Sequence, residues 1–93
     1  MSRAYTLEII RRAERALEDI PERSEVHLRE AILRLAENPR PAGCQKIQGR
    51  RNVYRIRVGD YRVIYTIEDK QRFVLVLEIG HRREIYQRRR RRA

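Results

Sequence analysis

Three arginines in the second half of the chain are spaced in a way that suits binding of a phosphate group. The segment 54–65 reads YRIRVGDYRVIY, in which Gly59-Asp60 predicts a two-residue turn between two strands. With that turn, Arg57 lies directly opposite Arg62, and strand alternation places Arg55 on the same face. Like charges in direct opposition destabilise a hairpin by about 0.2–1 kcal/mol. A bound phosphate would relieve this repulsion and use the bidentate geometry of the guanidinium groups.

A purely structural role is the alternative for these arginines. Surface strands carry Arg to discourage edge pairing, and Glu68 and Glu78 on neighbouring strands are candidates to neutralise the cluster. Glu78 is also a candidate base, although its ion-pair role is favoured. From the hairpin alone both interpretations stay open, and binding of sulfate or short RNA that is unaffected by Arg57→Glu would exclude the anion site.

The distribution of charge along the chain points to a polyanionic partner. The formal net charge is +10, and 21 of the 23 basic residues are arginines. Residues 1–38 carry a net charge of −1, whereas residues 39–93 carry 16 Lys or Arg against five Asp or Glu. Part of this excess is the run Arg88 to Arg92, but the segment before it is basic too. Such asymmetry is typical of chains that bind nucleic acid or an acidic protein.

Length and composition exclude several classes of protein. The 93 residues suit one domain over 1–87 followed by an Arg-rich tail over 88–93. No apolar run approaches the roughly 20 residues of a membrane span, and the start MSRAYTLEII predicts no signal peptide. A lone Cys44 fits a reducing cytoplasm. With only His27 and His81 beside it, we expect no metal site and no cofactor.

The positions of apolar residues predict an α+β fold. A short strand over residues 4–9 precedes a two-helix hairpin over 10–20 and 22–37, and residues 38–52 are predicted to form a loop. Three strands over 53–58, 61–68 and 73–79 follow as an antiparallel meander, so we expect a four-stranded sheet. Residues 80–83 are predicted to form a loop, and 84–92 a short C-terminal helix or tail. The helices should pack on one face of the sheet.

Three segments in this order resemble the RelE family of bacterial and archaeal toxins, within the RelE/ParE superfamily. They are NPRPAG (Asn38–Gly43), YRIRVGDYRVIY (Tyr54–Tyr65) and IGHRREIY (Ile79–Tyr86). The resemblance spans nearly the whole chain. It implies a toxin of a type II toxin–antitoxin system that enters the ribosomal A site as a metal-independent endoribonuclease. In that chemistry the 2′-hydroxyl of mRNA attacks the adjacent phosphate, and translation is inhibited.

The resemblance also implies partners and site residues. The partners are a cognate RelB-like antitoxin, the ribosome with its rRNA, the mRNA substrate, and operator DNA only through the antitoxin complex. The family's catalytic residues fall on Arg55, Arg57, Arg62, Arg82 and Tyr86. The leading member of the family has lysines at the first two positions, and an arginine cannot usefully lose its proton. The general base is therefore not assigned by the resemblance.

His81 is a further acid–base candidate, because its unperturbed pKa lies near neutrality and some relatives use a histidine in this loop. A plain loop role is favoured for it. Four other basic residues are predicted to contact RNA phosphates: Lys46, Arg50, Arg51 and Arg83. Tyr54 and Tyr65 share the apolar face of the hairpin and are expected in the core.

Two other functions stay open from the sequence. One is a ParE-like toxin that inhibits gyrase on the same fold, although that branch generally lacks the basic cluster. The other is a non-catalytic basic module that binds RNA or an antitoxin.

Overall fold

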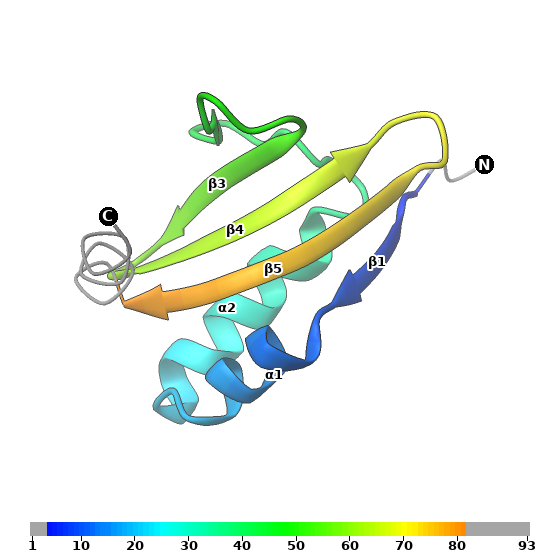
Figure 1. Ribbon diagram of the computed structural model, residues 1–93. Coiled ribbons are helices and arrows are strands. Elements are labelled where there is room, and N and C mark those ends of the chain that lie inside the picture. The colour runs from blue at the N-terminus through cyan, green and yellow to red at the C-terminus, as the bar shows by residue number, and fades with distance from the viewer. Residues whose placement is uncertain (1–3, 82–93) are drawn as a thin grey trace.

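The computed structural model describes residues 4–81 and has an α+β fold (Figure 1). The elements in chain order are β1 (Thr6–Ile9), α1 (Arg11–Glu18), α2 (Glu22–Arg34), β2 (Gln45–Lys46), β3 (Val53–Val58), β4 (Tyr61–Glu68) and β5 (Phe73–His81). Both helices cover the same face of the sheet, as the α+β prediction requires. No helix within these residues has the length and apolar character needed to cross a membrane.

The described strands form one mixed sheet in the order β1-β5-β4-β3-β2. β1 runs parallel to β5, and the other neighbouring pairs are antiparallel. The prediction of four strands was wrong by one, because Gln45 and Lys46 form an additional edge strand against β3. Two residues are too few to show strand alternation, and this pair lies in a segment rich in Pro and Gly.

The core lies between the two helices and the inner face of the sheet. Fully buried Ala13 and Leu17 form the inner stripe of α1, and Leu28 and Ile32 form that of α2. The sheet contributes Ile56, Val63, Tyr65, Ile67, Val74, Val76 and Ile79. In the β3–β4 hairpin these are alternating positions, so the three hairpin arginines lie on the opposite face.

A β-bulge interrupts the pairing of β4 with β5. Tyr65 pairs with Val76, whereas the preceding Ile64 pairs with Glu78, so Leu77 is the extra residue on β5. One extra residue exchanges the two faces of a strand beyond that point. Val76 and Ile79 therefore both lie in the core although three positions separate them, and Glu78 lies on the outer face.

β5 continues two residues further than predicted. Gly80 pairs with Arg62 and His81 pairs with Tyr61, so the prediction of a loop was wrong at these two residues. The glycine was read as a loop signal, but the long β4 continues to pair with β5 through it. The predicted helix over residues 84–92 and the Arg-rich tail lie outside the described residues.

The segment after α2 is anchored by a buried hydrogen bond. Tyr65 Oη donates to the carbonyl oxygen of Pro39 at 2.7 Å, and burial raises the pKa of this phenol. The ring of Tyr54 stacks on that of Tyr65 with centroids 6.1 Å apart. Tyr65 is a core residue and Tyr54 packs against the core, as predicted. This hydrogen bond holds the loop 38–44 near the first residues of β3, where Tyr54 pairs with Tyr65.

Candidate functional site

The β3–β4 hairpin has the register predicted from its turn. Val58 pairs with Tyr61 around Gly59-Asp60, and Arg57 pairs directly with Arg62. Gly59 has a φ of 61°, a left-handed conformation that glycine adopts without steric cost. The turn residue therefore sets the register that brings the two guanidinium-bearing positions together.

Two adjacent rows of the sheet carry three arginines and one glutamate on the outer face. The first row runs from Arg55 through Ile64 to Glu78, and the second from Arg57 through Arg62 to Gly80. We call the surface made by Arg55, Arg57 and Arg62 the arginine face. Neighbouring strands lie about 4.8 Å apart, so the side chains of these rows reach one another. Three cationic side chains and one carboxylate leave a net positive charge for an anion.

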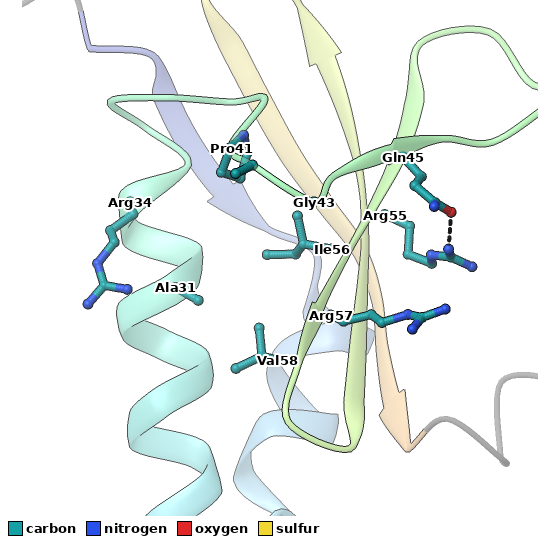
Figure 2. A pocket seen from close by; sticks show the side chains of 10 residues that line it. Ala31, Arg34, Pro41, Gly43, Gln45, Arg55, Ile56, Arg57 and Val58 are labelled. Carbon is teal, nitrogen blue, oxygen red and sulfur yellow. Dashed lines mark hydrogen bonds between the residues drawn. The ribbon is translucent and has the colours of Figure 1, made fainter.

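Other residues support the position of Arg55. Its guanidinium donates to Oε1 of Gln45 on β2 (Figure 2). Beneath the same face, Val53 and Ile64 form a small apolar cluster with Ile47, outside the main core. Arg57 is exposed and Arg62 is half-buried, so Arg57 is the more accessible member of the facing pair.

A groove of about 460 Å³ lies along the outer edge of β3, between this strand and α2. Figure 2 shows Ile56 and Val58 directed toward α2, while Arg55 and Arg57 point the other way. The remaining lining residues are Ala31, Arg34, Pro41, Ala42, Gly43 and Gln45. β2 pairs with β3 only as far as Arg55, so no strand of the described region pairs with the outer edge of residues 56–58.

The structure separates His81 from the arginine face. Its ring meets that of Tyr61 edge-on, with centroids 5.6 Å apart and an interplanar angle of 83°. Tyr61 is the cross-strand partner of His81 and packs against the main core. Residues paired across a ladder share a face, so His81 is directed to the helix-covered side of the sheet.

The predicted RNA-contacting residues that the structure describes lie at the β2–β3 connection. Lys46, Arg50 and Arg51 are all exposed there. The remaining predicted site residues, Arg82, Arg83 and Tyr86, lie outside the described residues. Within residues 4–81, no group of three or more His, Cys, Asp or Glu side chains is placed to hold a metal ion.

An ion-pair cluster at the β4–β5 turn was not found by sequence reasoning. Asp69 accepts hydrogen bonds from Arg40 at 2.9 and 3.2 Å and from Tyr5 Oη at 2.7 Å. Arg40 also lies over the ring of Tyr54, 5.1 Å from its centroid. These hydrogen bonds lower the pKa of Asp69 to about 2, and the bond from Arg40 has the larger effect. The cluster joins the residue before β1, the 38–44 loop and the β4–β5 turn, which are too far apart along the chain for any local pattern to reveal it.

Gln45 and Glu78 both lie beside the arginine face. The sequence predicts a loop at Gln45 and favours an ion-pair role for Glu78 on a neighbouring strand. The signal that could have found Glu78 is its position as the one charged residue in the apolar run FVLVLEIG.

Comparisons with known proteins agree with this fold. The family described as the ParE toxin of type II toxin–antitoxin systems matches residues 7–86. A curated relative from Methanocaldococcus jannaschii, named "Putative toxin RelE1", is 29% identical over 85 residues, which cover 88% of this chain and 94% of the relative.

Solved structures of RelE proteins share the architecture. RelE in the archaeal RelE–RelB complex of Pyrococcus horikoshii superposes with a TM-score of 0.77 at 28% identity, covering 85% of this chain and 96% of that one. The isolated RelE toxin of E. coli gives a TM-score of 0.74 at 26% identity, covering 96% and 98%.

The helix-covered mixed sheet and the family match over residues 7–86 together define a small toxin of the RelE/ParE superfamily. The chain belongs to the ParE toxin family of type II toxin–antitoxin systems, and its relatives and solved neighbours are of RelE type. The resemblance predicted from the three segments is confirmed.

Proposed function

We propose that this chain is a RelE-type toxin that cleaves mRNA in the ribosomal A site and so inhibits translation. The observation that carries the proposal is the direct opposition of Arg57 and Arg62, with Arg55 on the same face. Two arginines in direct opposition lower the stability of the hairpin, and a bound phosphate would offset their repulsion. Membership of the toxin family, with RelE among the solved neighbours, further supports a toxin that acts on RNA.

The proposed reaction is a metal-independent cleavage in which the nucleotide supplies its own nucleophile. The 2′-hydroxyl attacks the adjacent phosphate, the 5′ oxygen leaves, and a 2′,3′-cyclic phosphate remains. Negative charge develops on the non-bridging oxygens, where fixed guanidinium groups stabilise it. Arg62 and Arg82 are proposed to stabilise that charge, and Arg55 and Arg57 to position the phosphate. Tyr86 is proposed to stack on a base or to take part in proton transfer.

The basic residues outside the arginine face would contribute affinity. Lys46, Arg50 and Arg51 are exposed at one end of the sheet, where they can contact phosphates of mRNA or rRNA without touching the scissile bond. Arg83 is proposed to add a further contact. Such contacts position the complex on the ribosome in the cytoplasm and make binding dependent on salt.

A RelB-like antitoxin is the proposed regulatory partner, and operator DNA would be bound only through that complex. Support comes from the solved neighbours, which include RelE–RelB complexes from P. horikoshii and E. coli. The groove beside β3 also suits a polypeptide partner. Its apolar residues Ile56 and Val58, its cationic Arg34 and the outer edge of residues 56–58, with which no strand within residues 4–81 pairs, fit an extended segment that carries apolar and acidic side chains.

Mapping of mRNA 5′ ends on translating ribosomes after induction tests the proposed function. Induction should stop translation and leave new 5′ ends within translated codons, with 2′,3′-cyclic phosphates on the upstream fragments. Arg62→Ala should remove these cuts while the protein remains folded. Unchanged mRNA in cells whose growth is arrested by the wild-type chain would contradict the proposal.

Gyrase inhibition is the second candidate, and the match to the ParE toxin family favours it. It predicts a DNA-damage response on induction with mRNA left intact. The basic cluster on the outer face favours the ribonuclease. Cleavage of a phosphodiester uses such a cluster, and the gyrase-inhibiting branch of the superfamily generally lacks it. Binding of ribosomes or antitoxin without cleavage would instead identify a non-catalytic module.

A further inference from the structure

The arginine face contains a carboxylate that the bulge in β5 has placed there. Without Leu77 as an extra residue, Glu78 would pair with Val63, which is fully buried in the core. With the bulge, Glu78 pairs with Ile64 and lies on the outer face, half-buried. Bulges recur next to active sites, where they redirect a side chain.

The position of Glu78 relative to the arginines follows from the register. It lies in the same row as Arg55, two strands away, and diagonally next to Arg62. Diagonal neighbours on one face have Cα atoms about 7–8 Å apart, a distance that long side chains bridge. In the two rows formed by β3, β4 and β5, Glu78 is the single carboxylate.

A phosphate held by Arg57 and Arg62 would therefore have a carboxylate at its border. Three arginines and one glutamate leave a net charge of +2 in these rows, so the carboxylate does not cancel the attraction for the substrate. Arginine does not release its proton in proteins, and His81 is directed to the other side of the sheet. The described part of the site offers Glu78 as the group able to accept a proton.

We propose that Glu78 is the general base of the reaction, an inference that rests on the proposed ribonuclease function. Its carboxylate takes the proton of the 2′-hydroxyl while the 2′ oxygen forms a bond to phosphorus. The bond between phosphorus and the 5′ oxygen breaks, and its electron pair stays on that oxygen. A water molecule protonates the leaving oxygen, and the proton held by Glu78 neutralises the hydroxide formed. Arg62 stabilises the charge on the non-bridging oxygens throughout, while Arg57 holds the phosphate in position.

The test is single-turnover cleavage of mRNA in the A site of programmed ribosomes. A positioned proton acceptor contributes about 10²–10⁴-fold to the rate, so Glu78→Gln should lower cleavage at least 100-fold. Glu68→Gln is the matched control, because Glu68 is an exposed carboxylate on the same face at the far end of β4, paired with Phe73. This control should cleave within threefold of wild type.

Two further measurements separate a base from a residue that only holds Arg62 in place. Glu78→Gln should bind ribosomes programmed with 2′-deoxy substrate at least as tightly as wild type, since it removes a negative charge near the phosphate. Glu78→Ala should regain activity with added formate or acetate, more with acetate, the stronger base. Cleavage by Glu78→Gln within threefold of wild type, or rescue of Glu78→Ala that is equal for the two anions, would overturn the inference while the proposed function stands. Absence of cleavage by the wild-type chain would overturn both.

Discussion

Arg57 and Arg62 are direct cross-strand partners in the β3–β4 ladder, on the face of the sheet that the helices leave open. The pairing lowers stability, because the two arginines lie on neighbouring strands, cannot lose their charge and therefore repel each other. It also creates a site where one phosphate contacts two cationic forks. Activity and stability should therefore respond to mutation of this pair in opposite directions.

Arg57→Ala should lower mRNA cleavage by about 10²–10³-fold, the usual effect of losing one fixed donor to the reacting phosphate. The same change should raise the free energy of unfolding by about 0.2–1 kcal/mol, because the repulsion disappears. Urea denaturation and ribosome-dependent cleavage measure the two effects. Arg23→Ala removes an exposed arginine from α2, away from the sheet, and should leave both quantities unchanged. A loss of stability in Arg57→Ala would contradict the proposed repulsion.

The hairpin was predictable because its determinants are local. Gly59-Asp60 sets the turn, and apolar and charged residues alternate over residues 54–58 and 61–63, so register and faces followed from the sequence. The helices were predictable for the same reason, since the stripe of Ala13 and Leu17 repeats at helical spacing.

The bulge was not predictable, because the sequence around it carries no alternation. Val74, Leu75, Val76 and Leu77 are all apolar, so a shift of one residue leaves the local pattern unchanged. Only the partner strand decides where the extra residue lies. This shift determines the face on which Glu78 and His81 lie, so the sequence could name these two acid–base candidates but could not place them relative to the arginines.

The hydrogen bond from Tyr65 to Pro39 should contribute measurably to stability. Tyr65 is fully buried, and its hydroxyl is 2.7 Å from the Pro39 carbonyl oxygen. Tyr65→Phe leaves that buried carbonyl without its partner, and we expect a loss of about 1–3 kcal/mol in the free energy of unfolding by urea. Tyr54→Phe is the control. The Tyr54 hydroxyl accepts a hydrogen bond from exposed Arg40, so its removal should cost less. Equal losses in both variants would show that burial does not distinguish the two hydroxyls.

The Asp69 cluster should make stability depend on pH at the acidic end. Arg40 and Tyr5 lower the pKa of Asp69 to about 2 in the folded state, below its ordinary value near 3.9. A group with a lowered folded-state pKa stabilises the protein above its unfolded pKa, and this contribution disappears as the pH falls through the folded value. Wild type should therefore exceed Asp69→Asn in Tm at neutral pH, and the difference should shrink between about pH 4 and pH 2.

Glu68→Gln controls for the loss of a neighbouring exposed carboxylate in the same thermal series. Its difference from wild type should not follow the same curve. A Tm difference between wild type and Asp69→Asn that is constant down to pH 2 would contradict the assigned contacts.

Basic residues at the β2–β3 connection should affect RNA affinity and leave the rate of the bound complex unchanged. Lys46, Arg50 and Arg51 are exposed and lie away from the facing pair of arginines at the turn end of the hairpin. Each phosphate contact on single-stranded RNA adds about 0.7 to the slope of log affinity against log salt, so the triple alanine variant should reduce that slope by about 2. Its single-turnover rate at saturating ribosomes should equal that of wild type, whereas Arg57→Ala should lower the rate far more than the slope. An unchanged salt slope in the triple variant would show that these three side chains do not contact phosphate, and the arginine face would then have to account for binding as well as chemistry.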